Sequence, residues 1–257
     1  MNVIGVQLDT VWEDKAANHA KLADLLRDKC LQPGTLVVLP EMWATGFSLN
    51  VAAISETPSR DTEAFLEAQT ALYSITLIGG IVTTGADGKG QNEAVVFGPE
   101  GRETTRYAKM HPFSYGRETE KYGRGSQVVL FQWQGFTVAP FICYDLRFPE
   151  VFRHAAKHGA QVFPVIANWP QAREDHWMTL LKARAIENQA YVIGVNRCGH
   201  DPNLYYSGRS LIFSPRGEML ADGGEIEGLL QARLDLPALL EYRRAFPVLD
   251  DIHPDYQ

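Results

Sequence analysis

Short apolar runs that alternate with segments of helical spacing are the feature that most limits how this 257-residue chain can fold. The runs NVIGVQL, TLVVLP and ITLIGGIVTT have the length of buried strands. Between the first two runs lies a segment whose apolar residues recur at helical intervals, at Leu22, Leu25, Leu26 and Cys30. Such alternation is typical of α/β proteins, in which helices cover a sheet.

The rest of the first half follows the same plan. A helix is expected after Pro58, with Ser59 as its N-cap and with Phe65, Leu66 and Leu72 on its apolar side. The strand-like run 75–84 then turns back at GADGKG into two further runs, NEAVVFGPEG and RETTRYAK. The first half therefore predicts alternating strands and helices followed by a hairpin.

The second half repeats this organisation. Strands are expected at 136–144, 161–169, 191–199, 207–218 and 229–235, and helices at 149–157 and 173–189. The long helix carries Trp177, Leu180, Leu181 and Arg184 along one side. Two similar halves, each with helices on one face of its sheet, must bury the other face, and packing sheet on sheet buries both. From about residue 237 a short helix and an irregular tail are expected.

The bulk properties exclude several classes of partner. The formal charge is −7, and no run of Lys or Arg is present, so we expect neither nucleic acid nor an anionic membrane as a partner. The amino terminus lacks a basic region that leads into an apolar stretch, so neither a signal peptide nor a membrane span is expected. Three widely spaced cysteines favour a reducing cytoplasm.

Cys143 lies at the centre of FICYDLRFPE, where an apolar run stops and a proline opens a helical segment. This pattern predicts a thiol at a sharp connection between a strand and a helix, where nearby backbone N–H groups can bind an anion. The alternative is a packed core cysteine, because free cysteine is among the most buried residue types.

Glu41 and Lys109 each follow a strand-like run in the same way, in TLVVLPEMW and RYAKMHPF. Charged residues in exposed loops are usually solvated, but residues that directly follow buried strands project from sheet ends, where functional sites collect. We therefore expect Glu41, Lys109 and Cys143 to meet.

These three residues, in this order and within LPEMW, AKMHPF and ICYDLRFPE, resemble the carbon-nitrogen hydrolase (nitrilase) superfamily. The phrases LPEMWATGF, CYDLRFP, ANWP and RAIENQAYV look most like its omega-amidase branch. The resemblance implies a single four-layer α-β-β-α domain over residues 1–257. It also implies an enzyme without cofactor or metal that releases ammonia from a small omega-amide such as 2-oxoglutaramate. Relatives suggest a homodimer or larger assembly, with the tail crossing to a neighbouring subunit.

The resemblance also implies roles for the site residues. Cys143 would be the nucleophile and Glu41 the general base, while Lys109 and the backbone N–H of Tyr144 would hold the oxyanion. Lys109 would also favour the thiolate. A second glutamate commonly accompanies this trio. Glu118 and Glu120 compete for that role, and the spacing to Tyr122 and Gly125 favours Glu118.

An omega-amide carries a second carboxylate, which needs a cation. Arg173 is the first candidate and Arg117 the second, and either can instead be a surface charge. Arg147 is expected to pair with a buried carboxylate rather than to contact substrate. In ANWP, Asn168 would support the loop, and Trp169 would form a pocket wall or pack in the core.

Several other residues invite functional interpretations. His154 and His158 are spaced like metal ligands, but no third ligand is evident and solvated helix positions are expected. Structural roles are expected for the remaining candidates, which are His111, Glu187, Asn188, Cys30 and Cys198. A nitrilase or N-carbamoyl hydrolase would use the same three residues. A serine hydrolase would need a Gly-x-Ser-x-Gly elbow, which is absent. A binding protein on this scaffold and a redox sensor at Cys143 are further alternatives.

Overall fold

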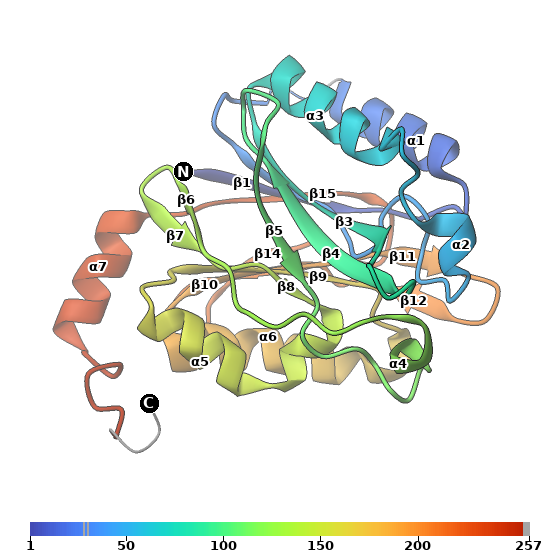
Figure 1. Cartoon of the computed structure of the whole chain (residues 1–257). Helices are drawn as coiled ribbons and strands as arrows, with labels where there is room; N and C mark the ends of the chain where they lie inside the picture. Colours follow the sequence, from blue (N-terminus) through green and yellow to red (C-terminus); the bar gives the residue numbers. More distant parts are fainter. Residues whose placement is uncertain (28, 30, 254–257) are drawn as a thin grey trace.

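Two mixed β-sheets lie at the centre of the structure (Figure 1). The computed structural model describes residues 1–27, 29 and 31–253. The first sheet has the order β15 (Gly228–Arg233), β1 (Asn2–Gln7), β2 (Leu36–Val38), β3 (Thr76–Thr84), β4 (Gly90–Phe97) and β5 (Glu103–Ala108). The second has the order β14 (Met219–Asp222), β13 (Leu211–Phe213), β10 (Tyr191–Asn196), β9 (Val162–Ala167), β7 (Phe136–Val138) and β6 (Phe131–Trp133). Strand β8 (Phe141–Ile142) also pairs with β9.

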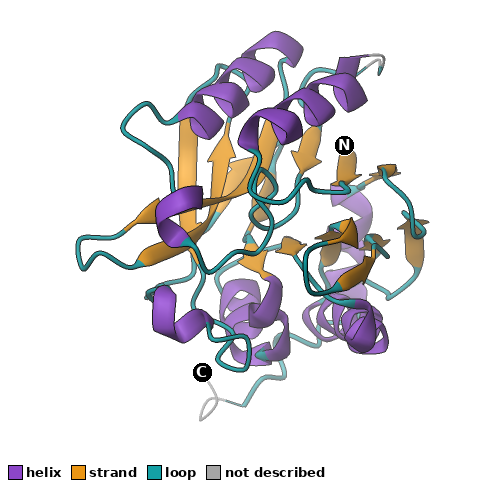
Figure 2. Cartoon of the chain, turned by 90° about the vertical axis from the view of Figure 1, so that its right-hand side faces the viewer, coloured by secondary structure: helices purple, strands orange, loops and turns teal. Residues whose placement is uncertain are grey.

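Helices cover the outer faces of the two sheets. Helices α1 (Lys15–Arg27) and α3 (Asp61–Tyr73) lie on the first sheet, and α5 (Pro149–Lys157) and α6 (Glu174–Asn188) lie on the second (Figures 1 and 2). This arrangement confirms the expected α-β-β-α sandwich. The shorter elements are α2 (Val51–Ile54), α4 (Glu118–Lys121), α7 (Leu236–Ala245), the 3-10 turns η1 (Cys143–Arg147) and η2 (Gln171–Arg173), and the hairpin of β11 (Cys198–His200) and β12 (Tyr205–Ser207).

The two sheets are joined by one apolar core. Because side chains alternate between the faces of a strand, Leu36 and Val38 point into this core while Val37 belongs to the cluster below α1 and α3. Leu22, Leu26 and Leu66 are fully buried in that outer cluster, as their spacing predicts. Cys30 lies outside the described residues.

Two details predicted for helix α3 are wrong. Leu72 is 68% exposed, because α3 turns this position to solvent. Ser59 does not cap the helix, since the Glu56 carboxylate accepts the hydrogen bond from the Thr62 N–H at 2.9 Å. The helix is therefore capped by an acidic side chain from the preceding loop.

The strand predicted at 136–144 is divided into β7 and β8. Proline has no backbone N–H to donate, and Pro140 lies between the two short strands. In the neighbouring β9, Pro164 lies between Val162, which pairs with β7, and Val165, which pairs with β8. Pairing with β9 resumes after the interruption and ends at Ile142, just before Cys143.

The last strand returns to the first sheet. Strand β15 pairs antiparallel with β1 along its full length, from Asn2 opposite Arg233 to Gln7 opposite Gly228. The sequence pattern assigns this strand to the second half but gives no pairing partner. Its position covers the edge of β1 and ties the two halves together.

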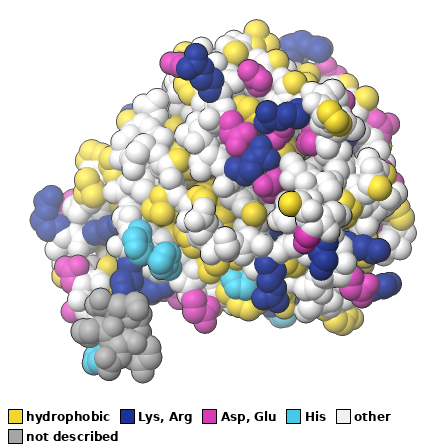
Figure 3. Space-filling view, viewed as in Figure 1, with side chains coloured by type: hydrophobic (Ala, Val, Ile, Leu, Met, Phe, Trp, Pro, Cys, Tyr) yellow, Lys and Arg dark blue, Asp and Glu magenta, His cyan; other side chains and the backbone are white. Residues whose placement is uncertain are grey.

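The surface carries mixed charge. Acidic and basic side chains are interspersed over the face shown in Figure 3. Within the described residues no helix has the length and apolar character that a membrane crossing requires.

An ion-pair network fixes the hairpin of β4 and β5, whose ends carry site residues, against α3. Arg106 on β5 pairs with Glu63, with Glu93 at 2.8 Å and with Glu103 at 2.8 Å. Glu63 also accepts a hydrogen bond from Arg60. Burial opposes ionisation of Glu63, but the two guanidinium groups outweigh it and hold its pKa below the ordinary value.

We expect Glu63→Gln to lower the free energy of unfolding by about 1 to 2 kcal/mol at neutral pH, because charge-assisted hydrogen bonds are lost. A carboxyl group whose pKa is lower in the folded state than in the unfolded state stabilises the fold at pH values above its unfolded pKa. This stabilisation is lost as the pH falls below about 4.5, the ordinary pKa of the Glu63 carboxyl group. Urea unfolding of both proteins at pH 7 and near pH 3.5 measures the difference. Glu120→Gln, at an exposed pair, is the matched control. An equal difference at both pH values would contradict the assignment.

Candidate active site

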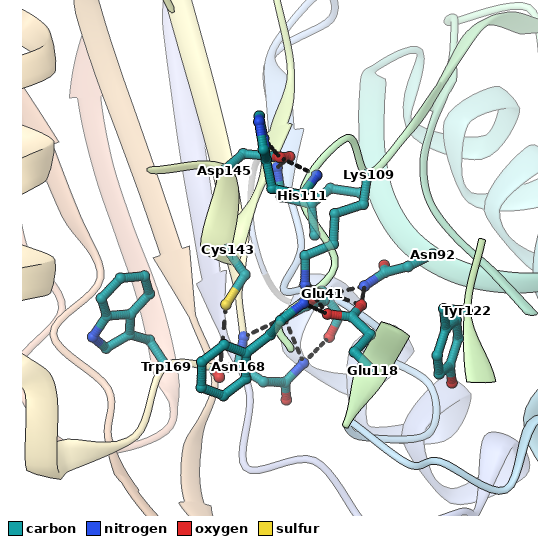
Figure 4. A network of polar contacts seen from close by, with 12 residues as sticks. Glu41, Asn92, Lys109, His111, Glu118, Tyr122, Cys143, Asp145, Asn168 and Trp169 are labelled. Atoms are coloured by element: carbon teal, nitrogen blue, oxygen red, sulfur yellow. Dashed lines mark hydrogen bonds and ion pairs between the residues drawn. The ribbon is translucent and has the colours of Figure 1, made fainter. Parts of the chain in front are cut away.

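The three residues singled out in the sequence meet where the two sheets pack together (Figure 4). Lys109 lies directly after β5, and its Nζ is 2.8 Å from Glu41 Oε1. Cys143 lies directly after β8, and Cys143 and Lys109 both line one cavity. Glu41 and Lys109 are 0% and 2% exposed, so this ion pair is shielded from bulk water.

A glycine in the neighbouring strand allows Glu41 to take its position. A Cβ at Gly80 would lie 2.5 Å from Met42 N and 2.6 Å from Glu41 Cα, which are backbone atoms that cannot move aside. The Gly80 N–H donates to the Pro40 carbonyl at 3.3 Å. The absence of a side chain at Gly80 therefore allows β3 to lie close to the Glu41 segment.

Cys143 occupies a strained turn between β8 and α5, as its motif predicts. Its φ is +46°, a left-handed conformation that non-glycine residues rarely adopt. Asp145 fixes this turn: its carboxylate accepts from Ile142 N at 3.1 Å and from Tyr107 Oη at 2.8 Å. His111 also contacts this carboxylate through its backbone N and its Nδ1, at 2.9 and 2.8 Å.

His111 thus has the structural hydrogen bond expected of it. Sequence analysis did not assign a role to Asp145, although its position two residues after Cys143 was a usable signal.

Glu118, and not Glu120, joins the cluster. Its two carboxylate oxygens lie 3.1 and 2.9 Å from Lys109 Nζ, and the side chain is fully buried. Glu120 instead pairs with Arg117 at 2.8 Å on the surface. Arg117 is therefore a surface charge, and its candidacy as the substrate cation is wrong.

Burial and neighbouring charges shift the pKa values of this cluster. Burial raises the pKa of the Cys143 thiol well above its ordinary range, and Glu41 raises it further, whereas Lys109 lowers it. Burial alone would lower the pKa of Lys109, but the carboxylates of Glu118 and Glu41 raise it well above its ordinary range. Lys109 therefore favours the thiolate, as expected, but burial and the carboxylates of Glu41 and Glu118 outweigh its effect on the thiol pKa.

Two asparagines complete the polar network. Asn168, directly after β9, donates its N–H to Glu41 Oε2 at 2.9 Å and its Nδ2 to the Glu41 carbonyl at 2.6 Å. Its own carbonyl lies 3.9 Å from Cys143 Sγ. Asn92 on β4 contacts both carboxylates, Glu41 at 2.7 Å and Glu118 at 2.9 Å. Asn168, expected to support its loop, also holds Glu41, whereas Asn92 was not predicted.

The cavity has a volume of about 450 Å³ and extends from the sulfur to an aromatic wall. Tyr144 and Trp169 both line it. Trp169 also packs against Trp177 with ring centroids 5.5 Å apart, so it combines the two expected alternatives, pocket wall and core residue.

Two arginines line the same cavity. The guanidinium of Arg173 lies 5.5 Å from the Phe113 ring, and that of Arg147 lies 4.9 Å from the Trp169 ring. Within the described part of the chain, neither forms an ion pair with a carboxylate. The expected pairing of Arg147 with a buried carboxylate is wrong, because the residue lines the cavity and its Nη2 contacts His176 Nδ1 at 3.2 Å.

The remaining candidates lie away from the cavity. The rings of His154, on α5, and His158, directly after it, lie 4.2 Å apart, and the described residues contain no group of three or more His, Cys, Asp or Glu that could hold a metal. Glu187 pairs with Arg184 at 2.9 Å. Asn188 and Cys198 are buried.

Similarity to known proteins agrees with this geometry. Residues 5–244 match the model of the carbon-nitrogen hydrolase family. A 2-oxoglutaramate amidase from Bacillus subtilis is 35% identical over 94% of this chain and 93% of its own length. The omega-amidase YafV from Escherichia coli K12 is 36% identical over 96% of this chain and 94% of its own length.

Solved structures give the same result. The carbon-nitrogen hydrolase superfamily protein XC1258 from Xanthomonas campestris, whose active site holds an arsenic adduct, superimposes with a TM-score of 0.91. It is 31% identical, and the match covers 98% of this chain and 97% of that one. The chain therefore belongs to the carbon-nitrogen hydrolase family.

Proposed function

We propose that this protein is an omega-amidase, which releases ammonia from a small omega-amide of a dicarboxylic acid such as 2-oxoglutaramate. The observation that carries the proposal is a cavity whose lining combines two chemically distinct groups of residues. Cys143 and Lys109 line it together with Arg147 and Arg173, which have no carboxylate partners among the described residues. An omega-amide has the matching pair of groups, an amide and a carboxylate. The names of the two relatives support this substrate class.

The reaction begins with a proton transfer from the thiol. Since burial and Glu41 raise the pKa of the Cys143 thiol, we expect Glu41 to take the thiol proton as the sulfur attacks the amide carbon. The tetrahedral oxyanion is held by the Lys109 ammonium and the backbone N–H of Tyr144. Glu41 returns the proton to the amide nitrogen, the C–N bond breaks, and ammonia leaves an acyl-thioester on Cys143.

Water completes the cycle. Glu41 takes a proton from water, whose oxygen attacks the thioester carbon. The C–S bond then breaks, the proton returns to the sulfur, and the dicarboxylic acid leaves. Glu118 keeps Lys109 protonated and oriented throughout. If one N–H of Lys109 serves Glu41 and one serves both oxygens of Glu118, the third remains for the oxyanion.

We also propose that the protein assembles as a homodimer or a larger oligomer, on the basis of the family resemblance. A cytoplasmic location is a further proposal, which rests on the cysteine content.

The substrate assignment predicts ammonia release from 2-oxoglutaramate, succinamate and glutaramate by the wild-type protein. Cys143→Ala and Glu41→Gln should each lower kcat by about 10³-fold or more, because no thioester forms without the nucleophile or its base. Turnover of a nitrile or an N-carbamoyl compound, with none of any omega-amide, would favour the alternative use of the same site.

The position of the two arginines predicts that their removal lowers kcat/KM only for substrates with a second carboxylate. Arg147→Ala and Arg173→Ala should each lower kcat/KM for glutaramate by about 10- to 100-fold, since a charge-assisted hydrogen bond contributes about 1.5 to 3 kcal/mol. Butyramide, which lacks the second carboxylate, should be hydrolysed equally by variants and wild type. Arg117→Ala is the matched surface control. Equal losses on both substrates would assign these arginines a structural role only.

The raised thiol pKa predicts slow alkylation at neutral pH. Because the thiolate is the reactive form, the rate of Cys143 modification by iodoacetamide should rise with pH through an inflection above 9.0. Mass spectrometry of the modified peptide, with Cys143→Ala as control, identifies the site. An inflection below pH 7 would instead indicate a thiolate–ammonium pair in the resting enzyme.

A further inference from the structure

We propose that Asn92 is a positioning residue that bridges the two site carboxylates and fixes their orientation around Lys109. This inference rests on the proposed function, in which Glu41 is the base and Glu118 orients Lys109. Asn92 is 1% exposed and reaches both carboxylates from β4 with a single nitrogen.

The contacts of Asn92 and Lys109 overlap. Asn92 Nδ2 lies 2.7 Å from Glu41 Oε1 and 2.9 Å from Glu118 Oε1. Lys109 Nζ contacts these same two oxygens at 2.8 and 3.1 Å. Each oxygen therefore receives one hydrogen bond from the cation and one from the neutral amide. The backbone joins the two donors as well, because the Lys109 N–H donates to the Asn92 carbonyl at 2.9 Å.

The chemistry of the neighbours fixes the orientation of the Asn92 amide. The opposite orientation would place its oxygen against two carboxylates, where both contacts would be repulsive. In the orientation present, Nδ2 uses both of its hydrogens, and Oδ1 is buried without a hydrogen-bond partner. A buried acceptor of this kind costs stability, so the gain must come from the two bonds that Nδ2 makes.

Charge balance explains why a neutral donor fits this position. Glu41 and Glu118 carry two negative charges against one positive charge on Lys109, in a region from which water is excluded. Other titratable groups that face Glu41 are Cys143 and Tyr122, both of which have raised pKa values because of burial and the carboxylates, so neither adds charge at neutral pH.

A second cation in place of Asn92 would compete with Lys109 for the carboxylates. A neutral double donor stabilises both carboxylates and leaves the ammonium free to serve the oxyanion.

Removing Asn92 should therefore free both carboxylates to move relative to Lys109, because each loses one of its two hydrogen bonds at the shared oxygen. For Asn92→Ala we expect kcat on 2-oxoglutaramate to fall at least about tenfold while KM stays within about threefold. Asn92→Asp keeps the shape but removes a donor and adds a third carboxyl group, so it should not restore activity.

Asn188→Ala is the matched control. Asn188 is also a fully buried asparagine with an unpartnered Oδ1, but it lies at the end of α6, where its Nδ2 bonds to the Arg184 carbonyl at 3.0 Å. Its loss should lower stability while kcat and KM stay unchanged. An unchanged kcat in Asn92→Ala, or full activity in Asn92→Asp, would overturn the positioning role.

A readout without turnover separates this inference from the proposed function. Crystal structures of the substrate-free variants supply this readout: in Asn92→Ala at least one of the Glu41 and Glu118 carboxylates should leave its position beside Lys109 Nζ, whereas in Asn188→Ala both should stay in place. If omega-amides are not hydrolysed but a carboxylate moves in Asn92→Ala, the proposed function fails and the inference stands. Unmoved carboxylates in Asn92→Ala overturn the inference.

Discussion

The site depends on one buried ammonium shared between two buried carboxylates. Removing three charges from water costs free energy that their mutual attraction offsets only when the remaining hydrogen-bonding groups are also satisfied. The chain meets this condition from several directions: the Asn168 N–H binds Glu41, the Phe113 N–H binds Glu118, and Asn92 binds both. The cluster therefore requires these segments to hold their places together.

The sandwich satisfies that requirement through the junction of its two sheets. The first sheet delivers Glu41 and Lys109 beyond β2 and β5, and the second delivers Cys143 and Asn168 beyond β8 and β9. Neither sheet alone contains a nucleophile together with its base. The apolar core between the sheets thus provides both stability and the catalytic geometry that we propose, because any sliding of one sheet against the other would separate sulfur from carboxylate.

The proposed specificity has a different physical basis from the chemistry. The reacting end works through fixed charges that are shielded from water, whereas the arginines lie against aromatic rings along the cavity wall. A guanidinium that stacks on a ring loses mobility but keeps its N–H edge available for a carboxylate. Such preorganisation lowers the entropic cost of substrate binding, and the cavity wall selects the far end of the substrate without changing the reacting end.

The sequence by itself determined the layers and the central residues. Periodicity located most strands and helices, and placing charged residues directly after apolar strands identified Glu41 and Lys109, because strand ends share a sheet edge. It did not reveal the bridge made by Asn92, the return of β15 to the first sheet, or the place of Arg147 in the cavity wall. Each of these depends on partners distant in the chain, as Asn92 and Glu41 are at 51 positions apart. The local sequence pattern indicates which face of a helix or strand is buried. Only tertiary packing decides which residues that face contacts.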